Sequence, residues 1–380
     1  MAPDRWHIIS GEYPPAGAGV ADYTAQVAAG LAARGADVHV HAPAPLAPTL
    51  DVAVHPLPDL FGASTCRALA QTLGRQPGTL LVQYVANALG RRGMNIGFCR
   101  WLRQQHEAGA DVRVMFHEPY FYFGWRRPWR NVLAIVQRRM ARELLRASSE
   151  AYLSTATWRR YLEPWAPADL SMHVLPIPSS IPRVADEAGL RRWRGRFGTR
   201  VAGHFGTFGS DVARELLPLL RQLLLQEPSL TFVGVGDGSD RFVRDLRLRD
   251  RALQDRVIST GRLDPADASA ALQACDLLVQ PYPDGVTTRR TSAMAGLANG
   301  VPIVSTDGAL TEGVWRETGA VALVRPGDPA ALADLVSTLL DDERARRGLA
   351  ARGRETYARE FALEVTLDRL THASAVRASA

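Results

Sequence analysis

The chain contains no lysine, and all 45 of its basic residues are arginine. This absence excludes catalysis through a lysine Schiff base or a lysine general base, and it excludes the Walker A phosphate loop, which needs its lysine. A GC-rich genome produces the same bias, so the absence by itself does not define a function. It does mean that any bound phosphate must be held by arginine side chains, backbone N–H groups, or both.

Cysteine is also scarce. Cys66, Cys99 and Cys275 lie far apart with no C-x-x-C pair, which excludes a cysteine-built zinc site and a disulfide framework and fits a reducing cytoplasm. No apolar run approaches the roughly 20 residues that span a bilayer, and the first residues do not resemble a signal peptide. We therefore expect a cytoplasmic protein.

Three sequence motifs that support hydrolysis or metal binding are missing as well. The chain has no D-x-D triplet, no H-x-x-x-H pair and no G-x-S-x-G elbow. The first two patterns hold metal ions and the third carries a serine nucleophile. We therefore expect no bound metal, no cofactor and no serine hydrolase chemistry.

The composition is that of a globular enzyme. The chain has 380 residues, of which 46% are hydrophobic and 22% charged, with a formal net charge of +6. At roughly 100–200 residues per domain, this length predicts two domains. Because the excess positive charge is modest and not concentrated in one block, we do not expect a nucleic-acid partner.

Strand-like and helix-like segments alternate along both halves of the chain. Residues 6–9, 38–40, 79–85, 112–116, 151–154 and 172–175 read as strands of a first domain, and 201–206, 230–235, 257–259, 277–280, 302–305 and 320–324 as strands of a second. Such alternation predicts parallel sheets covered by helices on both faces, with ligands outside the carboxyl ends of the strands.

The three prolines of the LPIPSSIPR segment mark the break between the halves. We predict an N-terminal domain over residues 1–178, a linker over 179–195 and a C-terminal domain over 196–355. Residues 356–380 are predicted to form a helix that packs back on the N-terminal domain. The fold class is α/β, with two doubly wound Rossmann-like domains facing a cleft.

The most informative segment is QPYPDGVTTRRTSAMAGLANGVP, residues 280–302. It predicts a strand end, a turn at Asp284-Gly285, a capping threonine at 287 or 288, and a helix over 289–298. Arg289 and Arg290 would then lie in the first turn, where the helix dipole disfavours cations. An anionic diphosphate would remove this conflict. The alternative is that both side chains extend into solvent.

This segment resembles the donor site of the retaining glycosyltransferases of family 4, which have the GT-B fold. Asp284-Gly285, Ser292, Ala293-Met294-Ala295, Gly300 and Pro302 occupy the positions of that family's E-x7-E and Ala-Met-Ala-x-Gly-x-Pro pattern. The resemblance implies transfer of a sugar from a nucleotide diphosphate sugar to a hydroxyl acceptor. The chain departs from the family at both acidic positions, since Asp284 and Ser292 stand in place of the two glutamates.

The resemblance extends to other strand-end loops of the second half. The segments VAGHFGTFGS, LTFVGVGDG and VISTGRL match the family's phosphate-binding glycine loop, second strand and base-proximal loop. It implies a donor site made of Gly206, Thr207, Gly209, Gly236, Thr260, Gly261, Arg262, Gly285, Val286, Thr287, Thr288 and Ser292. It also implies catalytic roles for His117 and Asp284, and the helix-dipole argument adds Arg289 and Arg290 as catalytic residues that stabilise the leaving diphosphate.

The first half is expected to bind the acceptor. The segment EYPPAGAGVADY resembles the family's first glycine loop, and His117 closes the strand VRVMF, as the family histidine near the reacting carbon does. The acceptor residues implied are Glu12, Gly17, Gly19, Asp22, Gln83, Glu118 and Tyr120. Carboxylates in this set suit an amine-bearing acceptor, such as an aminocyclitol of an antibiotic pathway.

Four further interpretations stay open at this stage. Residues 125–146 are rich in arginine and begin with Trp125 and Trp129, so the helix they predict is either an ordinary exposed face or a peripheral contact with an anionic membrane. The latter would fit a lipid- or polysaccharide-directed transferase. Loss of both glutamates would also fit a non-catalytic nucleotide-sugar-binding protein, and the same architecture serves nucleotide-sugar epimerases. The oligomeric state, the base and the sugar are not indicated.

Overall fold

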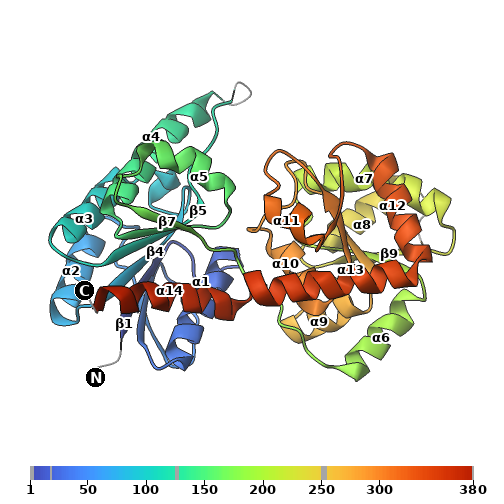
Figure 1. The fold of residues 1–380 in the computed structure, drawn as a ribbon, viewed down its shortest axis with the longest axis horizontal. Helices are drawn as coiled ribbons and strands as arrows, with labels where there is room; N and C mark the ends of the chain where they lie inside the picture. Colours follow the sequence, from blue (N-terminus) through green and yellow to red (C-terminus); the bar gives the residue numbers. More distant parts are fainter. Residues whose placement is uncertain (1–3, 18, 125–127, 250–254, 379–380) are drawn as a thin grey trace. The chain divides into compact units, whose positions relative to one another are not determined.

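The protein is described by a computed structural model, which covers residues 4–17, 19–124, 128–249 and 255–378. The chain forms two compact units. Unit 1 comprises Met1–Pro176 together with Leu363–Ala380, and unit 2 comprises Ile177–Ala362. Each unit carries one sheet flanked by helices on both faces (Figure 1). The strands paired within both sheets are parallel, which confirms the predicted α/β class.

Unit 1 contains a seven-stranded sheet in the order β3-β2-β1-β4-β5-β6-β7. Its strands are β1 (Arg5–Ser10), β2 (Asp37–Ala42), β3 (Val52–Pro56), β4 (Thr79–Val85), β5 (Val112–Glu118), β6 (Glu150–Leu153) and β7 (Ser171–Val174). Its helices are α1 (Gly19–Ala33), α2 (Ala63–Arg75), α3 (Ile96–Glu107), α4 (Trp129–Ala147), α5 (Thr157–Leu162) and α14 (Leu363–Ala378), with short 3₁₀ turns at Arg91–Gly93 and Glu163–Trp165.

Unit 2 contains a six-stranded sheet in the order β10-β9-β8-β11-β12-β13. Its strands are β8 (Val201–Phe205), β9 (Thr231–Val235), β10 (Val257–Ser259), β11 (Leu277–Gln280), β12 (Ile303–Thr306) and β13 (Ala322–Val324). Its helices are α6 (Glu187–Phe197), α7 (Ser210–Gln226), α8 (Ser239–Arg249), α9 (Pro265–Gln273), α10 (Thr291–Asn299), α11 (Gly313–Thr318), α12 (Pro329–Asp341) and α13 (Glu343–Thr356), followed by a π-helical turn at Tyr357–Phe361.

Helix α14 returns the chain to unit 1 after unit 2 is complete. It lies beside α1 (Figure 1), and a Cβ atom on Gly30 would clash with the Leu367 side chain. Arg113, buried in β5, donates a hydrogen bond from Nη1 to the carbonyl oxygen of Leu370 at 2.8 Å. Glycine at position 30 therefore permits close helix contact, and a buried cation fixes the position of α14.

The structure differs from the sequence expectation around the linker. Residues 179–195 belong to unit 2, and the second half of this interval forms most of α6, capped by the Asp186 carboxylate on the N–H of Gly189. The prolines end β7 and shape only the first part of the interval. Strand β3 was not predicted because its residues are half-exposed at the sheet edge, where the apolar pattern is weak.

Four histidine rings lie together on β1, β2 and β3. His7 stacks on His39 with ring centroids 5.1 Å apart, and His41 stacks on His55 at 4.9 Å. His7 Nδ1 and His41 Nε2 are 3.2 Å apart, as a hydrogen bond between neutral rings requires. Burial lowers the pKa of His41 to about 3 and also lowers the pKa values of His7 and His55.

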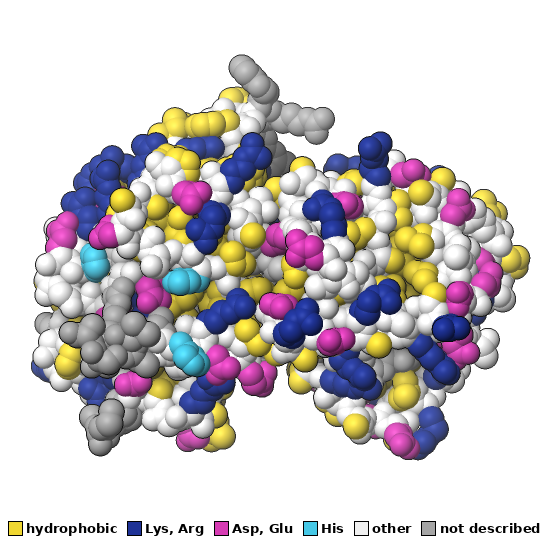
Figure 2. All heavy atoms as spheres, in the orientation of Figure 1, with side chains coloured by type: hydrophobic (Ala, Val, Ile, Leu, Met, Phe, Trp, Pro, Cys, Tyr) yellow, Lys and Arg dark blue, Asp and Glu magenta, His cyan; other side chains and the backbone are white. Residues whose placement is uncertain are grey.

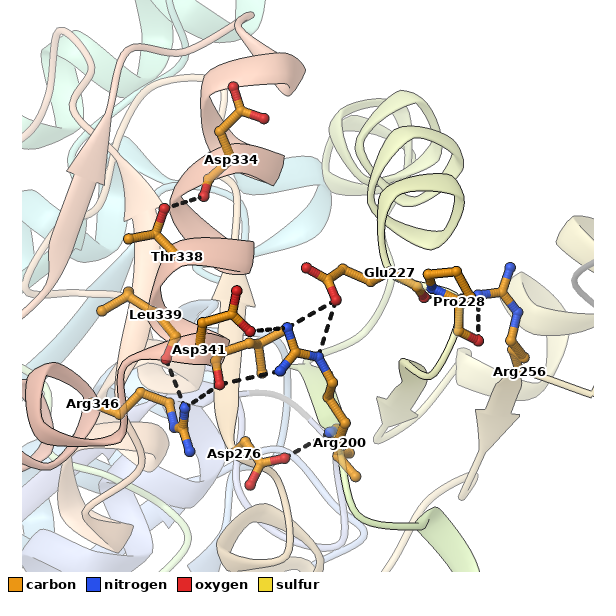
Figure 3. Close-up of polar contacts among 12 residues, drawn as sticks. Arg200, Glu227, Pro228, Arg256, Asp276, Asp334, Thr338, Leu339, Asp341 and Arg346 are labelled. Carbon is orange, nitrogen blue, oxygen red and sulfur yellow. Dashed lines mark hydrogen bonds and ion pairs between the residues drawn. The ribbon is translucent and has the colours of Figure 1, made fainter.

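The amino-terminal edge of the unit 2 sheet is braced by arginine–carboxylate pairs (Figure 3). Arg200, just before β8, pairs with Glu227 at 2.8 Å and with Asp341 at 2.7 Å. Asp276, just before β11, accepts a hydrogen bond from the Val201 N–H at 2.7 Å. These charges contact one another and the backbone, so this edge is structural. The loops at the opposite, carboxyl edge have a different character.

Candidate donor and acceptor sites

Backbone hydrogen bonds join three loops at the carboxyl edge of the unit 2 sheet. The Gly206 N–H donates to the Val235 carbonyl at 3.1 Å, and the Gly236 N–H donates to the Gly261 carbonyl at 3.2 Å. Gly236 has a φ of 110°, and a Cβ atom there would clash with the Gly206 carbonyl. Glycine at position 236, after β9, is therefore required for close contact with the loop after β8.

A pocket of about 200 Å³ lies at this edge, beside the loops that follow β8 and β11. Its lining includes the predicted residues Gly206, Thr207, Gly209, Arg289, Arg290 and Ser292, together with His204, Phe205, Phe208, Val212, Tyr282 and Thr291. Two helices begin at this pocket, α7 after Gly209 and α10 after Arg290, and neither N-terminus is capped by a side chain. Uncapped N–H groups and arginines together form an anion-binding environment.

Arg289 and Arg290 precede α10 and do not lie in its first turn. The helix begins at Thr291, and Arg290 occupies the capping position, so the predicted start at residue 289 is wrong. The Asp284 carboxylate lies 2.5 Å from Arg290 Nη2 and 3.6 Å from Arg289 Nη2. The expected conflict with the helix dipole is thus resolved within the protein, and the guanidinium groups remain in the pocket wall.

Arg290 is held in place from two sides. Its guanidinium carbon lies 4.5 Å from the centre of the Tyr282 ring, a favourable cation–π geometry, while Asp284 accepts its Nη2–H. Tyr282 in turn hydrogen-bonds Ser292, with 2.7 Å between Tyr282 Oη and Ser292 Oγ. Ser292, which stands at the family's second glutamate position, therefore takes part in the same cluster as Asp284.

His204 lines the same pocket in its neutral form. Burial lowers its pKa to about 4. Its Nδ1 lies 2.8 Å from the Val279 carbonyl oxygen, which can only accept, so the proton is on Nδ1. The lone pair on Nε2, which lies toward Gly206, suits a hydroxyl donor and not a phosphate oxygen.

Glu312, in the loop after β12, holds the segment between β11 and α10. Its carboxylate accepts the Thr288 N–H at 2.9 Å and the Thr288 hydroxyl at 2.5 Å. It also accepts the Trp315 Nε1–H at 2.9 Å, and only 8% of Glu312 is exposed. The sequence analysis predicted a helix cap at Thr287 or Thr288. That prediction is wrong, because Arg290 occupies the capping position of α10 and the N–H and hydroxyl of Thr288 donate to Glu312.

The remaining predicted donor residues fall into two groups. Val286 and Thr287 are fully buried and support the loop from inside, as does Gly285, whose φ is 92°. Thr260 lies beside the joined glycine loops, with its Oγ1 3.4 Å from the Gly236 nitrogen, whereas Arg262 is exposed. Sequence reasoning omitted Tyr282 and Glu312. The aromatic residue between two prolines was the available signal for Tyr282, and none marked Glu312.

The carboxyl edge of the unit 1 sheet brings together His117 and Gln83. His117 Nε2 lies 2.7 Å from Gln83 Oε1, and burial lowers the pKa of His117 to about 3. Gln83 is 1% exposed, and its side-chain nitrogen has no partner among the described residues. An unpartnered buried amide donor at a strand end is costly, and a bound hydroxyl would satisfy it.

The other predicted acceptor residues lie around this edge. Glu12 follows β1, Gly17 lies in the next loop, Gly19 begins α1 and Asp22 lies in the first turn of α1. Glu118 is the last residue of β5.

Tyr120 has a packing role. The Tyr120 hydroxyl donates to the Tyr161 carbonyl at 3.3 Å, and Arg138 covers its ring at 4.3 Å. It is half-buried and packs against the hydrophobic core of unit 1.

The residues that the structure describes contain no group of three or more His, Cys, Asp or Glu side chains arranged to hold a metal ion. They also contain no helix with both the length and the apolar character needed to cross a membrane.

Comparison with known proteins agrees with this geometry. Residues 200–342, which carry the unit 2 pocket, match the family described as "Glycosyl transferases group 1". Over 186 residues the chain is 28% identical to the 2-deoxystreptamine glucosyltransferase of Streptomyces kanamyceticus, an alignment that covers 48% of this chain and 46% of that protein. The chain spans less than half the length of the curated relatives it matches.

Solved structures resemble the whole chain. The sucrose-phosphate synthase of Thermosynechococcus elongatus superposes with a TM-score of 0.75 at 17% identity, covering 99% of this chain and 100% of that one. The Anabaena protein HepE in complex with UDP and glucose gives a TM-score of 0.68, also at 17% identity, covering 97% and 99%. The two units thus form the GT-B fold. The match to the group 1 glycosyltransferases covers residues 200–342, which lie within unit 2.

Proposed function

We propose that the protein transfers a sugar from a nucleotide diphosphate sugar to a hydroxyl acceptor, with the donor bound by unit 2 and the acceptor by unit 1. The observation that carries this proposal is the pocket of about 200 Å³ in which two uncapped helix N-termini meet the Arg289 and Arg290 side chains. Each helix start supplies about half a positive charge. This arrangement suits a diphosphate.

The chemistry needed from unit 2 is stabilisation of the leaving diphosphate. Negative charge grows on the bridging oxygen as the bond to the sugar breaks, and preorganised donors there stabilise the transition state more than the ground state. By analogy with single oxyanion donors, each arginine supplies about 2–4 kcal/mol. Asp284 contributes by fixing Arg290, and its direct contact with the donor sugar stays a prediction from the family resemblance.

Retention of the anomeric configuration is proposed on the same resemblance to family 4. The donor phosphate then takes the proton of the acceptor hydroxyl, so that the enzyme needs no general base of its own. His117 is neutral, and its proton points toward Gln83. A neutral imidazole can position the substrate without acting as the general base, which agrees with proton transfer to the donor phosphate.

An aminocyclitol is the acceptor that the observations favour. Glu12, Asp22 and Glu118 surround the carboxyl edge of the unit 1 sheet, where carboxylates would pair with the ammonium groups of such an acceptor. The relative from Streptomyces kanamyceticus is named for glucosyl transfer to 2-deoxystreptamine, and HepE binds UDP and glucose. We therefore propose a UDP-hexose donor and an amine-bearing cyclitol acceptor.

The experiment begins with ligand binding. Melting temperatures are measured with UDP, GDP, ADP and dTDP and their sugars, because a ligand that binds only the folded state raises the melting temperature by mass action. Transfer to 2-deoxystreptamine and to simple hydroxyl acceptors is then followed by mass spectrometry. Slow hydrolysis of the donor alone would already exclude a non-catalytic binding protein, and a rearranged sugar without acceptor would indicate an epimerase.

The role of the arginine pair is tested by Arg290→Ala. We expect turnover to fall by roughly 30- to 900-fold, corresponding to about 2–4 kcal/mol, with the fold intact. The control is Arg191→Ala, which removes an exposed guanidinium of unit 2 whose side chain is 73% accessible. Equal turnover in the two variants would contradict the proposed stabilisation of the leaving group.

A further inference from the structure

The outward face of α4 carries a single row of side chains. The exposed residues of this helix are Trp129, Val132, Ile135, Arg139, Arg142 and Arg146. Their spacings of three or four residues place them on one stripe. The first three are apolar and the last three are arginines, so the α4 stripe changes from hydrophobic to basic along the helix.

The apolar half of the α4 stripe is unusually exposed. The accessible fractions are 62% for Trp129, 59% for Val132 and 59% for Ile135. Tyr122 and Phe123, just before the helix, are exposed by 50% and 58%. These five side chains are half of the large exposed hydrophobic residues described in the chain. Exposed apolar side chains that follow one stripe of a helix indicate an interaction surface.

The basic half of the α4 stripe carries three arginines and no exposed carboxylate; Arg139 pairs with the buried Glu143, and the guanidinium carbon of Arg142 lies 4.4 Å from the centre of the Trp165 ring. The only carboxylate in α4 is Glu143, which is 1% exposed and is turned inward toward Arg103 at 2.9 Å. It also contacts Arg139 at 2.9 Å. Figure 2 shows dark-blue side chains grouped in the region of α3 and α4, with hydrophobic side chains near the start of α4. The surface is therefore complementary to a partner that is both anionic and apolar.

Arginines also support the aromatic side chains at the start of the helix. Arg138 lies 4.0 Å from the centre of the Phe123 ring, and Arg130 lies 4.2 Å from that of Phe121. These cation–π contacts hold the segment before α4 against the helix. Trp125, Arg126 and Arg127, which the sequence analysis included in this feature, lie outside the described residues.

We propose that the α4 stripe docks the protein on the surface of an anionic lipid bilayer. A helix of 19 residues is about 28 Å long, and a stripe along its side lets it lie in the plane of the interface. Trp, Tyr and Phe then enter the boundary between headgroups and acyl chains, and the arginines contact lipid phosphates. An acidic protein as the binding partner would pair with the arginines but would leave the apolar half of the α4 stripe exposed to water.

Sedimentation of the full chain with vesicles tests this proposal. The vesicles contain phosphatidylcholine alone or mixed with phosphatidylglycerol, at low and high salt. We expect strong binding to the anionic vesicles that weakens with salt. Replacing Arg139, Arg142 and Arg146 together by Gln should weaken binding on the order of a hundredfold, at roughly fivefold for each arginine. Replacing Trp129, Val132 and Ile135 together by Ser should abolish sedimentation with the vesicles.

Matched controls separate this surface from general stickiness. Leu225→Ser with Leu248→Ser removes two of the most exposed leucines, which are 78% and 77% accessible, and Arg191→Gln with Arg347→Gln removes exposed arginines of unit 2. These variants should bind vesicles as the wild type does. Absence of vesicle binding, binding unaffected by the α4 substitutions, or self-association through α4 without vesicle binding would each overturn the proposal. Nucleotide binding by unit 2 is measured separately, so failure here leaves the proposed function untouched.

Discussion

Glu312 allows the most demanding test of how unit 2 maintains its pocket. The carboxylate accepts hydrogen bonds from the Thr288 N–H, the Thr288 hydroxyl and the Trp315 indole. Replacement by Ala removes the acceptor of all three of these hydrogen bonds, at about 1–3 kcal/mol each for buried donors. We therefore expect Glu312→Ala to lower the local stability of the loop between β11 and α10 by at least about 3 kcal/mol.

Glu312→Gln separates shape from charge. Its amide oxygen can replace Oε2 and keep the bonds from the Thr288 N–H and the Trp315 indole, while the Thr288 hydroxyl turns to accept from the amide nitrogen. Only the charge assistance is lost, which corresponds to about 1 kcal/mol. The expected order of stability is therefore wild type, then Gln, then Ala.

Hydrogen exchange read by mass spectrometry is the suitable assay, because a two-unit chain need not unfold in one step. Protection factors of peptides covering residues 284–299 give the local opening free energy. Nucleotide affinity should fall in the same order, since Arg289 and Arg290 lie in this segment. Glu317→Ala, an exposed carboxylate on α11, is the control. If Glu312→Ala and Glu317→Ala differ by less than about 0.5 kcal/mol, the assigned role of Glu312 is refuted.

Two further predictions concern stability. Burial lowers the pKa of His41 from 6.5 to about 3, so below pH 6.5 the unfolded state binds more protons than the folded state and the protein loses stability as the pH falls. His41→Gln should remove about 2 kcal/mol of the stability loss between pH 7.5 and 5, measured as the exchange protection of β2 peptides. His372→Gln, at an exposed position, should leave this loss unchanged. Gly285→Ala should destabilise unit 2 because Gly285 has a φ of 92° and a Cβ atom would overlap the Thr311 hydroxyl. Gly209→Ala, which meets nothing within 4 Å, is the comparison, and equal melting temperatures would contradict this reasoning.

The sequence predicted the fold and the glycine loops because their signals are local. Apolar runs such as Thr79–Val85 and Leu277–Gln280 appear as strands with the predicted bounds. A turn glycine such as Gly236 is recognisable because only glycine tolerates its backbone conformation. Helix α6, which is capped by Asp186, was not predicted because the prolines just before it indicated a linker.

Long-range side-chain pairing was not predictable. Asp284 contacts both arginines because of the path of the turn between residues 284 and 290. Glu312 reaches Thr288 because β11 and β12 are neighbours in the sheet. Neither contact is marked by a periodic pattern of residues in the sequence. For this reason the sequence analysis did not foresee that Asp284 balances the charges of Arg289 and Arg290. The contacts with Asp284 also explain how the two guanidinium groups stay oriented.

The return of α14 to unit 1 affects the order of events during synthesis. When residues 1–176 leave the ribosome, the groove beside α1 that later receives Leu367 is open to water, and the Arg113 guanidinium lacks the carbonyl of Leu370. Both contacts form only after the 186 residues of unit 2 have been translated. The first-made half of the protein is therefore the last to reach its final state, and chaperone capture or proteolysis of nascent chains should concentrate on that uncovered groove.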